Sequence, residues 1–323
     1  MTLAVEATEL RRTFRTTTGT VRRTRKDVEA VKGISFHIEQ GELFGLLGPN
    51  GAGKTTTIKM LITLLLPTSG SARVLGHDVV ADTREVRRRI GYVFGGDRGL
   101  YERLSARDNL RYFSELYGVP PRTQATRIDE LLELVGLTER DRERVEGYSR
   151  GMRQRLHIAR GLLHDPDVLF LDEPSIGIDP VGARELRATI GNLVEMGKTV
   201  LLTTHYMFEA DELCDRIAVI REGEIVAEGT PAQLKGRVSG GRVVEVETYG
   251  VLEETVAEVG TVAGIRSVAV EERGQQQVLI IQCERDAEVT QAVLARLGDV
   301  RVGRVTAREP TLEDAYVELV TGS

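Results

Sequence analysis

The stretch that decides the fold reads GPNGAGKT and occupies residues 48–55. It fills every fixed position of the pattern G-x-x-x-x-G-K-[ST], follows the apolar run ELFGLLG and opens a helical pattern. Glycines at these positions let backbone N–H groups converge on phosphate oxygens without clashes from Cβ atoms. The sequence therefore predicts a phosphate-binding loop between a buried strand and a helix.

This loop supplies candidate residues for binding a nucleoside triphosphate with its metal ion. Lys54 would reach the β- and γ-phosphates, and the Thr55 hydroxyl would ligate Mg²⁺. We therefore expect a nucleoside triphosphate and Mg²⁺ at this loop. The residues predicted to bind nucleotide here are Gly48, Pro49, Asn50, Gly51, Ala52, Gly53, Lys54, Thr55 and Thr56.

A second motif, VLFLDEP at 168–174, reads as a short buried parallel strand that ends in acids. Asp172 would hold Mg²⁺ directly or through water, and its neighbour Glu173 would orient the attacking water. His205 follows another apolar strand, TVLLTT, and would reach the same carboxyl edge of the sheet. A lone histidine at such a place is more often structural, so the prediction that His205 is catalytic depends on the surrounding pattern.

Composition narrows the class of protein. The 323 residues carry 43 basic and 49 acidic side chains, a net charge of −6 that does not favour nucleic acid as a partner. Two cysteines, Cys214 and Cys283, are too few and too far apart for a disulfide framework or a metal site. No apolar run approaches the ~20 residues that span a bilayer, so we expect any membrane association to depend on a partner.

The chain divides into two predicted domains. Residues 1–236 hold the motifs, with strands up to residue 47 and a mostly helical stretch at about 97–165. After the Gly- and Ser-containing segment KGRVSGG the pattern becomes β-α-β-β-α-β plus a last helix over 242–323, as in a ferredoxin-like unit. The basic segment 11–26 is predicted to form an extended hairpin or loop; a solvated hairpin and contact with anionic lipid headgroups both remain open.

The motifs, in this order, resemble those of the ATP-binding cassette (ABC) ATPases over residues 3–235. The matching elements are GPNGAGKTT, the signature YSRGM at 148–152, LFLDEP, SIGID at 175–179 and the histidine of TTHYMFEAD. The resemblance implies an α/β fold: an ABC-type P-loop NTPase core with an antiparallel β subdomain and a helical subdomain, followed here by the small α+β (ferredoxin-like) domain.

The resemblance also implies how the signature works. In such ATPases two copies sandwich two nucleotides head to tail, and the signature of one subunit completes the ATP site of the other. Ser149 and Gly151 would therefore contact the partner's γ-phosphate in a homodimer. Phe14 matches the aromatic that stacks on adenine in this family, although a core or surface aromatic is the alternative.

Two departures from the family pattern stand out. The usual LSGGQ reads YSRGM, so Arg150 replaces a glycine and Met152 a glutamine. The glutamine expected after the strand IGYVF is also missing, since Gly95 and Gly96 stand there and Asp97 is the nearest candidate substitute. Because Ser149 and Gly151 are retained, we expect the signature to function with altered geometry. The missing glutamine bears on how the nucleotide state is passed to the partner more than on ATP binding.

The tail REPTLEDAYVELVTG resembles that of daunorubicin-resistance-type ATPases, which drive type-2 ABC exporters. The resemblance implies an ATP-hydrolysing subunit that powers export through a separate type-2 permease at the cytoplasmic face of the membrane. Alternatives are the ATPase of an importer, which usually carries a longer all-β tail, and a soluble ABC ATPase of translation or DNA repair. The sequence shows one cassette and no heptad run of the kind repair ATPases carry.

Overall fold

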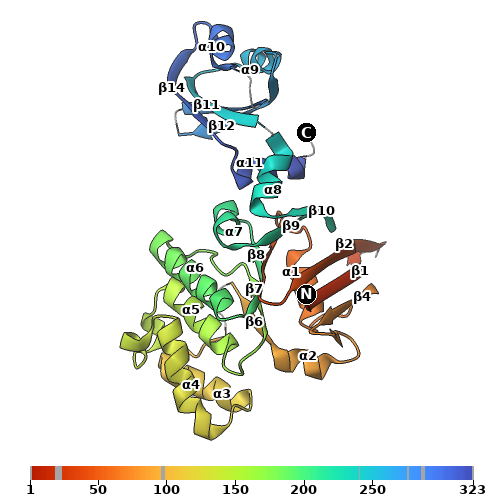
Figure 1. Ribbon diagram of the computed structural model, residues 1–323, viewed down its shortest axis with the longest axis vertical. Helices are drawn as coiled ribbons and strands as arrows, with labels where there is room; N and C mark the ends of the chain where they lie inside the picture. Colours follow the sequence, from red (N-terminus) through yellow and green to blue (C-terminus); the bar gives the residue numbers. More distant parts are fainter. Residues whose placement is uncertain are drawn as a thin grey trace. The chain divides into compact units, whose positions relative to one another are not determined.

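The computed structural model describes residues 2–18, 24–95, 99–239, 241–274, 276–284 and 288–321, and the chain forms two compact units. The first unit is Met1–Thr230 and the second is Pro231–Ser323. Each unit has a hydrophobic core of its own. Figure 1 shows the helices and strands of both units, coloured in chain order from red to blue.

The first unit is built on a six-stranded sheet in the order β10-β9-β3-β8-β7-β6. The strands from β9 to β6 run parallel, whereas β10 joins β9 in the antiparallel direction. Every residue of β3, β7 and β8 is buried, as expected of apolar strands covered on both faces. Their bounds are β3 Leu43–Leu47, β6 Ile90–Phe94, β7 Val168–Asp172, β8 Thr199–Thr204, β9 Arg216–Arg221 and β10 Glu224–Gly229.

A second, antiparallel sheet in the order β2-β1-β4-β5 packs in the same core. β1 and β2 pair as a long hairpin from Leu3↔Glu39 to Thr18↔Thr24, which confirms the hairpin predicted for the basic segment. Gly19, expected at its centre, lies outside the described residues. The bounds are β1 Leu3–Thr18, β2 Thr24–Glu39, β4 Ser69–Val74 and β5 His77–Asp78.

Helices complete the first unit, and α3, α4 and α5 pack together as a helical part (Figure 1). Ser105 caps α3 by accepting a hydrogen bond from the Asp108 amide at 3.0 Å. The bounds are α1 Lys54–Leu61, α2 Thr83–Arg89, α3 Ala106–Leu116, α4 Pro121–Leu134, α5 Arg150–Gly161, α6 Pro180–Glu195 and α7 Met207–Leu213, with short 3₁₀ turns at Thr138–Arg140 and Val145–Gly147.

The second unit has an antiparallel sheet in the order β12-β13-β11-β14. Counted within the unit this is the order 2-3-1-4, and with helices after the first and third strands it confirms the predicted ferredoxin-like pattern. Valines and leucines of α9 and α10 pack with β11 and β13 to form its core. The bounds are α8 Pro231–Ser239, β11 Gly241–Tyr249, α9 Glu253–Gly260, β12 Ile265–Arg273, β13 Gln276–Glu284, α10 Thr290–Leu297, β14 Arg301–Arg308 and α11 Leu312–Thr321.

Helix α8 covers residues expected at the end of the first domain, but it belongs to the second unit, where it packs against α11. The overall class is as predicted: an α/β P-loop core with an antiparallel sheet and a helical part, followed by an α+β domain. Within the residues that the structure describes, no helix is long and apolar enough to cross a bilayer.

Candidate functional site

The phosphate loop connects β3 to α1, and two of its glycines are required by their surroundings. A Cβ on Gly48 would lie 2.3 Å from the Ile220 carbonyl oxygen. Gly53 has a φ of 114°, and a Cβ there would lie 2.6 Å from the Ala30 carbonyl oxygen. The loop therefore fits closely against β2 and β9, and it delivers the start of α1 to the carboxyl edge of the central sheet.

Lys54 is held at the centre of this site. Its side chain is 5% exposed, and Nζ donates hydrogen bonds to the carbonyl oxygens of Gly48 at 2.7 Å and Pro49 at 3.3 Å. The same ammonium lies 3.1 Å from Oε1 of Glu173. The structure thus joins the lysine that follows β3 to the glutamate that follows β7, the two strands that flank β8 in the sheet.

Thr55 and Asp172 form the part of the site that suits a metal ion. The Thr55 hydroxyl donates to Asp172 Oδ1 at 3.2 Å, and the Thr203 hydroxyl donates to the same oxygen at 2.6 Å. Mg²⁺ prefers oxygen ligands and is usually held by one or two protein oxygens together with substrate phosphates and water. A hydroxyl and a carboxylate beside a phosphate loop fit that donor set.

Asp172 also affects the pKa of Tyr92 on the neighbouring strand β6. Burial, followed by the charge of Asp172, raises the pKa of the Tyr92 phenol well above its usual range. Tyr92 is therefore neutral near pH 7, and the negative charge in this region belongs to the carboxylates at the sheet edge.

Glu173 is fixed by contacts at both its backbone and its carboxylate. Its amide donates to the Thr203 hydroxyl at 3.0 Å, and its φ of 54° lies in the left-handed region that is uncommon for residues other than glycine. One carboxylate oxygen contacts Lys54, and the other forms a short hydrogen bond with Nδ1 of His205. Strained backbone of this kind is found most often at functional sites.

The structure thus brings together Lys54, Thr55, Asp172, Glu173 and His205. It adds Thr203, which sequence reasoning missed although this hydroxyl contacts both Asp172 and the Glu173 amide. The available signal was a pair of buried threonines, Thr203 and Thr204, at the end of the strand directly before the candidate histidine.

A buried glutamate on α7 is a further residue that the sequence did not reveal. Glu209 is 2% exposed and accepts a hydrogen bond from the Ser175 hydroxyl at 2.9 Å. Burial raises the pKa of the Glu209 carboxyl above its usual range. Its contact fastens the segment that follows Glu173 to the helix that follows His205.

The signature lies at the start of α5. Ser149 is the N-cap residue and accepts a hydrogen bond from the Met152 amide at 3.2 Å. Gly151 is buried against α6, where a Cβ would lie 3.1 Å from Gly182 Cα. Within the described residues, no hydrogen bond joins Ser149 or Gly151 to the phosphate loop of their own chain.

The arginines that follow the signature have structural contacts. Arg155 is buried, and its guanidinium donates to the Val135 carbonyl oxygen at 2.6 Å and pairs with Glu185 at 2.8 Å. Arg153 lies 3.5 Å from Glu102. These side chains hold α5 within the helical part.

Phe14 stands on β1 opposite Val28 of β2. The Arg12 guanidinium lies over its ring, 4.7 Å from the centroid. Among the described contacts none joins this ring to the phosphate loop, so stacking on adenine stays a prediction.

The packing of Gly95, directly after β6, explains why the expected glutamine side chain is absent at this position. The Gly95 amide donates to the Asp172 carbonyl oxygen at 2.6 Å, and a Cβ on Gly95 would lie 2.2 Å from the Glu173 carbonyl oxygen. Glutamine cannot occupy this position without moving the backbone. The other candidates, Gly96 and Asp97, lie outside the described residues.

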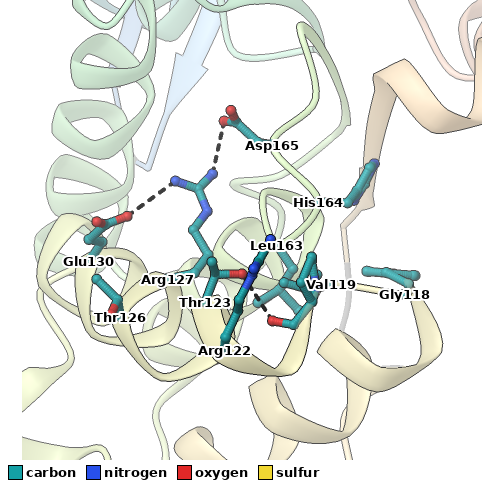
Figure 2. A pocket seen from close by; sticks show the side chains of 12 residues that line it. Gly118, Val119, Arg122, Thr123, Thr126, Arg127, Glu130, Leu163, His164 and Asp165 are labelled. Carbon is teal, nitrogen blue, oxygen red and sulfur yellow. Dashed lines mark hydrogen bonds and ion pairs between the residues drawn. The ribbon is translucent and has the colours of Figure 1, made fainter.

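A separate cavity of about 570 Å³ lies in the helical part (Figure 2). Arg127 crosses it and pairs with Asp165 at 3.0 Å and with Glu130 at 3.5 Å. None of the predicted nucleotide-binding or catalytic residues lines this cavity.

Comparison with known proteins agrees with this geometry. Residues 31–176 match the family model described as ABC transporter, and residues 229–320 match that of the C-terminal domain of DrrA1-3-like ATP-binding proteins. The linearmycin resistance ATP-binding protein LnrL of Bacillus subtilis (strain 168) is 37% identical over 290 residues, 90% of this chain and 93% of that protein. The daunorubicin resistance ATP-binding protein DrrA3 of Streptomyces coeruleorubidus is 40% identical over 296 residues, 91% of this chain and 92% of that protein.

A solved structure shows the same fold. The ATP-binding cassette MJ0796, a dimer in a post-hydrolysis state bound to ADP and phosphate, superimposes with a TM-score of 0.60 at 25% identity. The match covers 70% of this chain and 98% of the cassette.

Proposed function

Because the chain belongs to the family of ABC transporter ATP-binding proteins, we propose that it is the ATP-hydrolysing subunit of an ABC exporter and works with a separate membrane permease. The observation that carries the proposal is the convergence of Lys54, Thr55, Asp172 and Glu173 at one edge of the central sheet. Two relatives of the chain are named as linearmycin and daunorubicin resistance proteins, and outward transport would provide such resistance.

The residues of the chain divide the chemistry between them. Lys54 exchanges its contact with Glu173 for the β- and γ-phosphates of ATP. Thr55 and Asp172 would hold Mg²⁺, which would neutralise phosphate charge. Glu173 accepts the proton of the attacking water, and His205 keeps that carboxylate oriented.

The signature is proposed to serve a second copy of the chain. Ser149 is exposed and caps a helix whose first turn carries no acidic residue, so its N-terminus attracts an anion. The absence of a described contact with its own phosphate loop supports action on the partner's nucleotide in a head-to-tail homodimer. The dimeric state of the related cassette also supports it.

The remaining partner would be a permease of the type-2 exporter class, reached from the cytoplasmic face of the membrane. The match of the second unit to the DrrA-like C-terminal domain supports this class. Recovery of such a permease with the tagged chain from detergent-solubilised membranes would test it, and capture of an importer permease instead would contradict it.

The nucleotide site is tested by Lys54→Ala, with Lys59→Ala as the matched control. Both lysines lie on α1, but Lys59 is exposed and takes no part in the site. Lys54→Ala should weaken ATP binding in a titration and abolish turnover while the folded state persists, because the shape of the loop comes from its glycines. Equal ATP affinity in the two variants would refute the assignment.

The homodimer is tested by mixing Gly151→Asp chains with Lys54→Ala chains. If the signature acts in trans, the heterodimer keeps one intact site and should hydrolyse ATP faster than either variant alone. If it acts in cis, every site carries a defect and mixing restores nothing. A heterodimer of wild-type and doubly substituted chains gives the reciprocal result: it should be inactive if the signature acts in trans and active if it acts in cis.

A further inference from the structure

The arginine within the signature has a specific partner in its own chain. Arg150 is the first residue of α5 and is exposed, and its Nη1 donates a hydrogen bond to the Gly177 carbonyl oxygen at 3.2 Å. Gly177 has a φ of +71°, and a Cβ there would lie 2.6 Å from that nitrogen. The guanidinium and the glycine backbone are therefore closely apposed.

Charge pairing does not account for this placement. A cation at the start of a helix faces the positive end of the helix dipole, which is unfavourable. Across the described ranges, no carboxylate lies within ion-pair distance of Arg150, and its hydrogen-bond partner is the neutral carbonyl of Gly177. What the side chain gains is a fixed connection to the segment that contains Gly177.

That segment is the loop from Glu173 to Asp179, and it is fastened along its length. It begins at the proposed base, whose own φ is positive, and Ser175 is bound to Glu209. It ends where Asp179 caps α6 by accepting from the amides of Val181 at 3.1 Å and Gly182 at 3.0 Å. The Arg150 contact holds the loop midway between these two attachments.

The start of α5 also packs directly on this loop. A Cβ on Gly151 would lie 3.3 Å from Cγ2 of Ile178, besides its close approach to Gly182. A movement at the start of α5 is thus transmitted to the loop by backbone packing on one side and by the Arg150 hydrogen bond on the other.

We propose that Arg150 is a positioning residue that fixes loop 173–179 of its own chain, and so connects the signature to the carboxylate of Glu173. This inference rests on the proposed function, in which the signature faces the nucleotide of the partner. A single chain then links two ATP sites: Glu173 acts in one, and Arg150 lies beside the residues that contact the other.

A heterodimer with one working site distinguishes this role from a direct contact with phosphate. The first chain keeps Lys54, and the second carries Lys54→Ala. The working site then uses the phosphate loop and Glu173 of the first chain and the signature of the second. Differently tagged chains allow Arg150→Ala to be placed in either one.

With Arg150→Ala in the first chain, kcat should fall by about threefold to tenfold, the effect expected for one lost hydrogen bond of an exposed side chain. The KM for ATP should stay within about twofold, because the phosphate loop is unchanged. Arg150→Lys, which keeps a donor, should recover part of the loss. Arg142→Ala, an exposed arginine of the helical part, is the matched control and should have no effect.

The opposite result would overturn the inference. If Arg150→Ala lowers kcat in the second chain but not in the first, the guanidinium acts on the nucleotide and not on its own loop. An inactive heterodimer of wild-type and Lys54→Ala chains would show that turnover needs two intact phosphate loops, and the double-mutant cycle below then decides on Arg150.

A double-mutant cycle in homodimers decides the matter independently of the heterodimer. Gly177→Ala breaks the same contact from the other side while leaving the charge of Arg150 in place. Arg150→Ala and Gly177→Ala should therefore be non-additive in kcat, whereas additive losses would refute the connection.

Discussion

Replacing Glu173 by glutamine separates the two roles that the structure gives this carboxylate. One oxygen lies 3.1 Å from Lys54 Nζ, and the other is hydrogen-bonded to His205 Nδ1. Glutamine keeps the size of the side chain and the ability to form hydrogen bonds, but it removes both the negative charge and the basicity. The substitution should therefore change turnover and ATP affinity in opposite directions.

Turnover should fall by about 10²–10⁴-fold, the usual contribution of a general base. In free energy this is about 3–5 kcal/mol on the barrier, at about 1.4 kcal/mol for each factor of ten. A loss of this size is expected because contacts at the amide and at both carboxylate oxygens fix the orientation of the Glu173 carboxylate.

ATP binding should become tighter, because Lys54 must leave Glu173 before it can contact phosphate. Unit charges 3.1 Å apart attract by about 5 kcal/mol at an effective dielectric constant of about 20. Desolvation offsets most of this in a largely buried pair. A net value of about 1.5 kcal/mol, typical of a hydrogen bond to a charged group, predicts about tenfold tighter ATP binding by Glu173→Gln.

Two assays on one preparation test these effects: phosphate release at saturating ATP, and titration with ATP under conditions that prevent turnover. Glu195→Gln, at the exposed end of α6, is the control for the change in charge. A rate within about threefold of wild type would refute Glu173 as the base, since that is far below the range for general-base catalysis. Unchanged ATP affinity would refute the view that the Lys54–Glu173 ion pair competes with the nucleotide.

Three further predictions concern residues outside this pair. His157 is buried, and burial together with Arg160 lowers its pKa from 6.5 to about 3, so between these values the unfolded chain binds a proton that the folded chain does not. The free energy of unfolding should therefore fall as the pH drops through that range. In urea titrations, the free energy of unfolding of His157→Leu should fall by about 1 kcal/mol less than that of wild type between about pH 7 and 5.5. Parallel pH profiles of the two proteins would contradict this expectation. Gly95→Gln should lower both Tm and ATPase rate, because its Cβ would meet the Glu173 carbonyl oxygen at 2.2 Å, and an unchanged Tm would show that the backbone adapts. A chain ending at Thr230 should still bind ATP but show weaker self-association or transport, so full dimer affinity with full transport would make the second unit dispensable.

The fold was predictable wherever one local rule fixed one element. The apolar runs before Gly48 and up to Asp172 became fully buried parallel strands, because the sheet is covered on both faces. A glycine-containing pair between two apolar runs is typical of a tight turn, and Glu222 and Gly223 both have positive φ between β9 and β10. The ferredoxin-like unit followed from the order of its elements alone, although its sequence carries no motif.

Long-range contacts of polar side chains were not predictable in the same way. Arg155 reads as a surface residue of a helix, but carbonyl oxygens of the helical part and Glu185 turn it inward. Thr203 and Glu209 lie in the segment TTHYMFEAD, where the resemblance singled out only the histidine, and their importance comes from what β7 and its following loop bring near them. Such contacts depend on how elements pack, and sequence spacing does not record this.

If Glu173 is the base, as proposed, the arrangement of charge at the sheet edge links ATP binding to its activation. While Lys54 contacts Glu173, the carboxylate is committed to a cation and its Oε1 is not available to a water molecule. A nucleotide that draws Lys54 towards its phosphates releases Oε1, while His205 continues to hold Oε2. Glu173 then becomes an acceptor for a proton at the moment when the γ-phosphate is in place. We therefore expect the lysine and the histidine to differ in kinetic effect: loss of His205 should lower kcat with little change in ATP affinity, whereas loss of Lys54 should weaken ATP binding as well as abolish turnover.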